Sequence, residues 1–101
     1  MEQDLKEFLQ TGKGWDRIKT KTPGLFIRKL PGSAKRGSSL AIELNPPDQD
    51  GNPTKKNGLF IRTSRDVDFY KKMLEHPQIP KVLEMLSKVN PAQEEERILD
   101  I

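Results

Sequence analysis

The chain has no cysteine and a single histidine. Disulfide bonds and thiolate metal sites are therefore excluded, and a chain without cysteine suits the reducing interior of the cell, so the sequence predicts a cytoplasmic protein. His76 has no second histidine or cysteine to complete a metal site. We therefore expect neither a bound metal nor a cofactor.

Long apolar runs are also absent, so the sequence predicts no secretory signal, no membrane span and no membrane partner. Apolar residues make up 33% of the chain and charged residues another 33%. A chain of 101 residues with this composition has room for one small domain with a thin core. We expect a single domain over residues 1–92, followed by an acidic tail or docking segment over residues 93–101.

Acidic residues are scarce in the middle of the chain. Between Lys13 and Arg65 there are twelve lysines and arginines and four acids, so this stretch has a net charge of +8. Because the whole chain has a net charge of +3, the remaining residues carry −5. Such asymmetry is typical of a surface that binds a polyanion, although a charged run can also serve only to keep a face solvated. The acids are scattered and this stretch has no histidine, so the ingredients of metal-dependent or nucleophilic catalysis are missing. We expect no enzymatic activity and no small-molecule substrate.

Periodicity and turn residues predict an α+β fold with an N-terminal helix, a four-stranded antiparallel sheet and two or three C-terminal helices covering one sheet face. The first helix covers residues 4–10 and ends at glycines. The predicted strands are residues 15–21, 25–30, 40–44 and 59–62. Thr63 to Asp66 has the form of a capping box that starts the next helix. Pro80 suits the first turn of a second helix with an apolar stripe from Ile79 to Val89.

A pentapeptide occurs twice, as Gly24 to Arg28 and as Gly58 to Arg62, with the letters Gly-Leu-Phe-Ile-Arg. In a strand, alternate side chains point to opposite faces, so leucine and isoleucine share one face while phenylalanine and arginine share the other. We expect the aliphatic face to be the core and the phenylalanine face to be open to solvent. The alternative is that a bulge shifts the alternation and buries the two phenylalanines instead.

The expected core and the expected binding surface follow from this alternation. The core set is Ile18, Leu25, Ile27, Leu40, Ile42, Leu44, Leu59 and Ile61. The expected nucleic-acid-binding set is Trp15, Arg17, Lys19, Phe26, Arg28, Lys35, Arg36, Lys55, Lys56, Phe60 and Arg62. Trp15 has a second interpretation, because a tryptophan near the start of a strand often closes the edge of a core.

The run from Leu40 to Leu74 resembles the single-strand DNA-binding domain of the positive cofactor four family of transcriptional coactivators. It has a strand, an acidic turn, the basic segment Lys55-Lys56-Asn57-Gly58, a further strand and an amphipathic helix. The resemblance implies that an open sheet face binds unpaired strands and that the helix dimerises, and it carries over Lys55, Lys56 and Gly58. The order of elements is also similar to that of archaeal single-strand DNA-binding proteins of the ThermoDBP type.

Aromatic rings beside cations suit unpaired nucleic acid, because exposed bases stack on rings while arginine and lysine bind phosphates. We therefore expect a homodimer that binds single-stranded nucleic acid, with single-stranded DNA as the leading candidate and RNA also compatible. The alternatives are a module for duplex DNA or RNA, or a transcription-associated module that recruits a protein through the C-terminal stripe.

Overall fold

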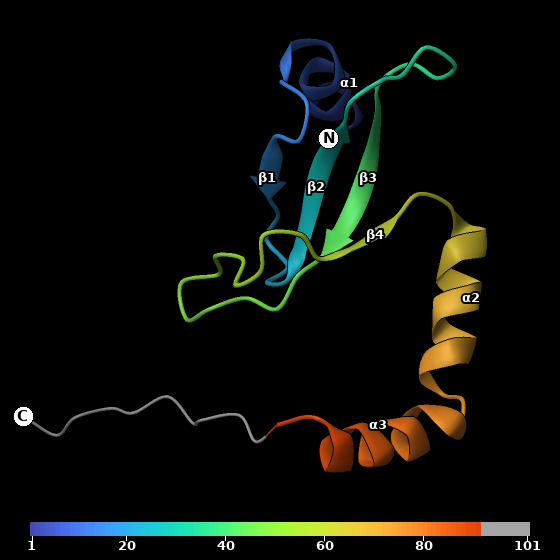
Figure 1. The fold of residues 1–101 in the computed structure, drawn as a ribbon. Coiled ribbons are helices and arrows are strands. Elements are labelled where there is room, and N and C mark those ends of the chain that lie inside the picture. The colour runs from blue at the N-terminus through green and yellow to red at the C-terminus, as the bar shows by residue number, and fades with distance from the viewer. Residues whose placement is uncertain (92–101) are drawn as a thin grey trace, which may run out of the picture. The chain divides into compact units, whose positions relative to one another are not determined.

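The computed structural model describes residues 1–91, so the expected tail at residues 93–101 lies outside the described residues. The elements are α1 (Glu2–Thr11), β1 (Arg17–Lys19), β2 (Leu25–Leu30), β3 (Ser39–Leu44), β4 (Leu59–Ile61), α2 (Ser64–Leu74) and α3 (Gln78–Val89) (Figure 1). The strands form one antiparallel sheet in the order β1-β2-β3-β4. The predicted α+β fold, with its N-terminal helix, four strands and two C-terminal helices, is confirmed.

Residues 1–91 divide into two compact units, with the boundary between Val67 and Asp68. The expectation that the C-terminal helices cover one face of the sheet stays a prediction, as does the expectation of a single domain over residues 1–92.

The sheet has two chemically distinct faces, and the predicted alternation is confirmed without a bulge. Ile18 pairs with Ile27, and Ile27 with Ile42. The aliphatic face, as we call it, contains Ile18, Leu25, Ile27, Leu40, Ile42, Leu44, Leu59 and Ile61. The opposite face, called the Phe26 face, contains Arg17, Lys19, Phe26, Arg28, Ala41, Glu43 and Phe60.

Burial is the reverse of what we expected. Phe26 is 1% exposed and Glu43 is fully buried, whereas Ile18 and Leu44 on the aliphatic face are 37% and 41% exposed. Ile61 is the buried member of the aliphatic set, and the remaining five are half-buried. The densest packing of the sheet is therefore on the Phe26 face, which the sequence predicted to be open.

Helix α1 covers part of the aliphatic face. Its Leu5 lines a pocket together with Ile27 and Leu40, and the buried Lys29 donates a hydrogen bond from Nζ to the carbonyl oxygen of Gly12 at 2.6 Å. Gly12 is the residue at which α1 ends, as predicted. This bond fixes the C-terminal end of α1 against β2.

Helix α2 starts at the predicted capping box. The Thr63 hydroxyl accepts a hydrogen bond from the Asp66 amide at 3.3 Å, and the Asp66 carboxylate accepts one from the Thr63 amide at 3.3 Å. Pro80 lies in the first turn of α3, where the missing amide proton breaks no helical hydrogen bond. Both helices expose large apolar side chains, namely Val67, Phe69, Met73 and Leu74 on α2, and Val82, Leu83, Met85, Leu86 and Val89 on α3.

Candidate nucleic-acid interface

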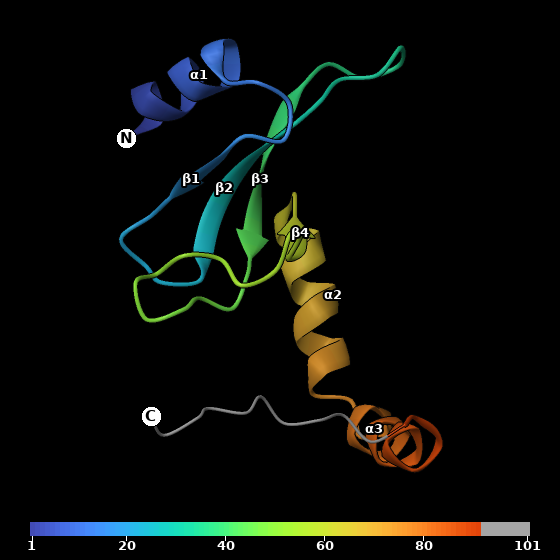
Figure 2. The same ribbon diagram turned by 60° about the vertical axis from the view of Figure 1, so that its left-hand side comes forward.

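A long connection between β3 and β4, residues 45–58, turns back near the ends of β1 and β2 (Figures 1 and 2). Its last residues lie over the Phe26 face, where the Lys56 carbonyl accepts from Arg17 and the Gly58 amide donates to Glu43, and we call this connection the covering loop. Its first part closes on itself. The Asp48 carboxylate accepts hydrogen bonds from the amides of Asp50 and Asn52 at 2.9 and 2.8 Å, and Gly51 supplies the left-handed turn with φ of +81°. Thr54 donates to the Pro46 carbonyl at 2.6 Å. The closed turn directs the following lysine segment back across the sheet.

The covering loop is joined to the sheet by a buried carboxylate, that of Glu43. Arg17 donates from Nε to Glu43 Oε1 at 2.6 Å and from Nη2 to Oε2 at 3.1 Å, so this pair is bidentate. Arg28 donates from Nη1 to Oε2 at 3.1 Å, and Asn45 donates from Nδ2 at 3.2 Å. The Gly58 amide donates to Oε2 at 2.7 Å. The carboxylate therefore links three strands to the end of the covering loop.

Backbone carbonyls of the covering loop satisfy the remaining donors. Arg17 Nη2 donates to the Lys56 carbonyl at 2.8 Å, and Asn45 Nδ2 donates to the Lys55 carbonyl at 2.8 Å. The Lys55 amide in turn donates to Asn45 Oδ1 at 3.1 Å. Within residues 1–91, no buried side-chain nitrogen or oxygen lacks a hydrogen-bond partner. The polar interior is thus fully satisfied, which is the condition under which buried charge is tolerated.

Glu43 stays ionised in this setting. Burial by itself would raise the pKa of Glu43, but the hydrogen bonds from Arg17, from the Gly58 amide, from Asn45 and from Arg28 outweigh it and lower the pKa from 4.5 to about 2. One buried negative charge therefore faces two guanidinium groups, and the cluster has a net charge of +1. The hydrogen bonds of Asp48 to the Asn52 and Asp50 amides likewise lower the pKa of that carboxyl.

The side chains of Trp15, Arg28 and Phe60 lie close together and form an aromatic and cationic group. The ring centroids of Trp15 and Phe60 lie 6.2 Å apart. The Arg28 guanidinium carbon lies 5.8 Å from the Trp15 centroid and 5.4 Å from the Phe60 centroid. Arg28 Nε also donates to the Trp15 carbonyl at 3.1 Å. We call Trp15, Arg28 and Phe60, together with Lys55 and Lys56 of the covering loop, the Trp15 patch.

Trp15 is the exposed part of this group, with 54% of its surface accessible. Its backbone has a φ of +72°, in the left-handed region that a bulky side chain rarely adopts. The conformation is held by the hydrogen bond from its amide to the Lys29 carbonyl at 2.7 Å and by the bond that its own carbonyl accepts from Arg28. Strain of this kind typically amounts to about 1 to 3 kcal/mol and is concentrated at functional sites.

For two of the predicted contact residues, the expected exposure to solvent is wrong. Phe26 and Arg28 are buried, because the covering loop lies over β2 and Glu43 draws the guanidinium inward. Arg17 is also tied to Glu43 and stacks on Phe26, with its guanidinium carbon 5.5 Å from the ring centroid, although part of its side chain remains accessible. Phe60 is half-buried, with its ring centroid 6.2 Å from that of Trp15. The alternation was right, and the error lay in which face is covered.

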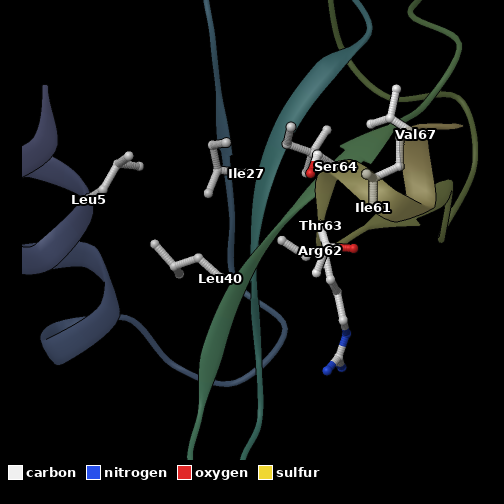
Figure 3. Close-up of a pocket in the computed structure, with 10 residues that line it drawn as sticks. Leu5, Ile27, Leu40, Ile61, Arg62, Thr63, Ser64 and Val67 are labelled. Atoms are coloured by element: carbon white, nitrogen blue, oxygen red, sulfur yellow. The ribbon is translucent and has the colours of Figure 1, made fainter.

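The remaining predicted residues fall into two groups. Lys55 and Lys56 are exposed on the covering loop, and Lys19 is exposed with its Nζ donating to the Asp50 carbonyl of that loop at 3.2 Å. Lys35 and Arg36 are exposed on the separate hairpin between β2 and β3 (Figures 1 and 2). Arg62 is exposed beside the pocket on the aliphatic side, and Figure 3 shows its side chain extending away from Leu5 and Leu40. The structure therefore does not join Lys35, Arg36 or Arg62 to the Trp15 patch.

Glu43 and Asn45 are the important residues that the sequence interpretation missed. The signal was present in part, because Glu43 lies inside a predicted strand of the basic stretch and its parity places it on the face opposite Leu40 and Leu44. Its partners Arg17 and Arg28 lie 26 and 15 residues away in sequence. The register of β1 with β2, which pairs Arg17 with Arg28, and that of β2 with β3, which pairs Phe26 with Glu43, bring them together.

The aliphatic face has a shallow pocket of about 360 Å³ (Figure 3). Its apolar lining includes Leu5, Ile27, Leu40, Ile42, Ile61 and Val67. Thr63 and Ser64 at its edge belong to the start of α2, where Asp66 already accepts the free amides of Arg62 and Thr63. The pocket therefore offers mainly apolar contact.

Comparisons with models of known protein families, with characterised proteins and with solved structures find no match for this chain. In the described residues, no three histidine, aspartate or glutamate side chains lie close enough together to hold a metal ion. No helix in residues 1–91 has both the length and the apolar character needed to cross a membrane.

Proposed function

We propose that this chain is a non-catalytic binding protein for single-stranded nucleic acid, with single-stranded DNA as the leading ligand. The observation that carries the proposal is Trp15: an indole that is half exposed, held in a strained backbone conformation and close to both the Phe60 ring and a buried guanidinium. An unpaired base stacks on such a ring with a gain of about 1 to 3 kcal/mol. A duplex keeps its bases inside the helix and gains much less from the ring.

The charge around Trp15 favours an anionic ligand over a cationic one. Aromatic cages bind quaternary ammonium groups when the rings face a neutral or acidic surrounding. Here the Arg28 guanidinium carbon lies 5.8 and 5.4 Å from the two ring centroids, and Lys55 and Lys56 are exposed on the covering loop. These cations repel an ammonium group and attract phosphate, so a nucleotide strand is the ligand whose base and backbone fit together.

Phosphate contacts come from the exposed lysines, since Arg28 is buried and the Arg17 charge is shared with Glu43. Lys19, Lys55 and Lys56, with the net positive charge of the Glu43 cluster, make about four effective contacts. The logarithm of the binding constant should then fall against the logarithm of salt concentration with a slope of about −3. A slope near zero would contradict electrostatic binding by this surface.

The test compares an unpaired oligonucleotide with the same sequence as a duplex, using a fluorescent label on the nucleic acid. We expect tighter binding of the unpaired strand, and the intrinsic fluorescence of Trp15 should be quenched on binding. Trp15→Ala should weaken binding by about 5-fold to 150-fold, which corresponds to the loss of one stacked base. Trp15→Phe keeps a ring and should retain most of the affinity.

Phe69→Ala is the matched control once sedimentation shows that its oligomeric state equals that of the wild type, because Phe69 is an equally exposed aromatic residue on α2 and takes no part in the patch. The Phe69→Ala variant should bind the unpaired oligonucleotide with the affinity of the wild type. Tighter binding of the duplex, or equal loss in the Trp15→Ala and Phe69→Ala variants, would refute the proposal. Comparing deoxyribose and ribose strands decides between DNA and RNA, because only RNA offers a 2′-hydroxyl.

We further propose that the protein is a homodimer, as expected from the sequence, and that it works in the cytoplasm. Nine of the 23 residues in α2 and α3 are large apolar side chains exposed in the single chain. Faces of this size on a small protein usually pair with another surface. Sedimentation should give twice the chain mass of 11.6 kDa. Leu83→Asp and Leu86→Asp together should give the monomer, whereas a monomeric wild type would refute this part.

A further inference from the structure

We propose that Glu43 is a positioning residue for nucleic-acid binding: a buried carboxylate that never meets the ligand, yet fixes both aromatic rings and the lysine segment that do. The inference rests on the proposed function, because it assigns the internal support of the same surface. It goes beyond that function because it assigns a positioning role to Glu43, an acidic residue beneath a surface that attracts a polyanion.

Both rings of the Trp15 patch are tied to this one carboxylate. On one side, Arg28 donates from Nη1 to Glu43 Oε2 at 3.1 Å and from Nε to the Trp15 carbonyl at 3.1 Å, so the guanidinium joins the carboxylate to the strained Trp15 backbone. On the other side, the Gly58 amide donates to the same oxygen at 2.7 Å, two residues before Phe60. Loss of the carboxylate removes both attachments at once.

The lysine segment depends on the same centre. Asn45 receives its orientation from Glu43, to which it donates at 3.2 Å. The Asn45 side chain then makes two hydrogen bonds to the backbone of Lys55: its Oδ1 accepts from the Lys55 amide at 3.1 Å, and its Nδ2 donates to the Lys55 carbonyl at 2.8 Å. Lys56 is held through its carbonyl by Arg17, the bidentate partner of Glu43. The backbone of the two exposed lysines is thereby fixed beside the rings, while their side chains remain accessible.

A role of Glu43 through its charge alone and a role in positioning the patch predict opposite changes in affinity when the carboxylate is removed, so the inference can be tested. Glu43→Gln raises the net charge from +3 to +4, and by charge alone a more positive protein binds a polyanion more tightly. A glutamine cannot accept from two arginines and an amide as a carboxylate does, so the positioning role predicts weaker binding instead. Asp50→Asn makes the same change in charge at an exposed position of the covering loop and is the matched control.

The experiment measures binding of a labelled unpaired oligonucleotide by wild type, Glu43→Gln and Asp50→Asn under conditions where each is folded by circular dichroism. We expect Glu43→Gln to bind at least about 5-fold more weakly, the equivalent of part of one stacking contact, and Asp50→Asn to bind equally or more tightly. Equal or tighter binding by folded Glu43→Gln would overturn the inference. Asn45→Ala is the second variant, since Asn45 is buried and the change leaves the charge unaltered; it should also bind more weakly.

Hydrogen exchange of the wild type alone keeps the inference separate from the proposed function. The amides of Lys55 and Gly58 should exchange much more slowly than that of Gly37, which stands in open space on the other hairpin. If the wild type binds no oligonucleotide, the proposed function fails, and slow exchange would still support the structural role of Glu43. Fast exchange at Lys55 and Gly58 would refute that role even if the wild type binds.

Discussion

Acidification should remove a defined part of the stability of this fold through Glu43. The folded protein holds the pKa of Glu43 at about 2, whereas the usual value of 4.5 applies once the chain unfolds. The folded state therefore favours the carboxylate, and the stabilisation is complete above pH 4.5 and is lost as the pH falls towards 2. The difference of about 2.5 pH units corresponds to about 3 kcal/mol. Roughly 2 kcal/mol of this should already be lost between pH 5 and pH 3.

The assay is urea unfolding followed by the fluorescence of Trp15, for wild type and Glu43→Gln, at several pH values from 7 to 3. At neutral pH, Glu43→Gln should be less stable by about 3 kcal/mol, because two guanidinium groups lose their buried partner. The difference in unfolding free energy between the two proteins should narrow by about 2 kcal/mol on going to pH 3, since Glu43 of the unfolded wild-type chain then binds a proton while the folded carboxylate stays largely ionised.

Glu7→Gln provides the control, because Glu7 is an exposed glutamate of α1 whose side chain has no salt bridge within residues 1–91. Its unfolding free energy should follow that of the wild type at each pH. A constant gap between wild type and Glu43→Gln at all pH values would refute the reasoning, since it would mean that the folded state does not favour the ionised carboxylate.

Three further substitutions, one of them with a matched control, test the local geometry. Gly58→Ala should lower the free energy of unfolding by about 2 to 3 kcal/mol, because a Cβ there would collide with the Leu44 carbonyl, whereas Gly37→Ala meets nothing and should be neutral in the same urea assay. Thr63→Ala should cost about 1 kcal/mol in thermal unfolding, since it removes the cap of α2. Trp15→Asn should change stability by less than about 1 kcal/mol, because relief of the left-handed strain offsets the lost ring contacts, yet it should bind an unpaired oligonucleotide as weakly as Trp15→Ala.

Local patterns in the sequence were enough to predict the elements of this fold. The helical spacing of Leu5, Phe8 and Leu9 and the glycines after them predicted α1. The strict alternation from Leu40 to Leu44 predicted β3, and the capping box from Thr63 predicted the start of α2. Each of these features depends on residues within a few positions of one another, so a single sequence contains the necessary information.

The covered face of the sheet could not be predicted in the same way. From hydrophobicity alone, the aliphatic face was expected to be the core, and its eight aliphatic side chains are enough to form one. The outcome depends on where the covering loop lies and on the pairing of Arg17 and Arg28 with Glu43, which joins strands far apart in sequence. A buried ion cluster is stable only when every donor finds an acceptor, and that condition belongs to the three-dimensional structure.

The two copies of Gly-Leu-Phe-Ile-Arg have different structural roles because their strands have different neighbours in the sheet. Strand β2 lies between β1 and β3, so Phe26 is enclosed under the covering loop, while β4 is an edge strand and leaves Phe60 half exposed beside Trp15. The glycines differ as well: Gly24 adopts a φ of +88°, whereas Gly58 is needed because no Cβ fits against β3. One copy therefore builds the buried support, and the other presents an aromatic ring at the surface. A Phe26→Ala substitution should consequently unfold the protein, and Phe60→Ala should leave it folded with weaker binding.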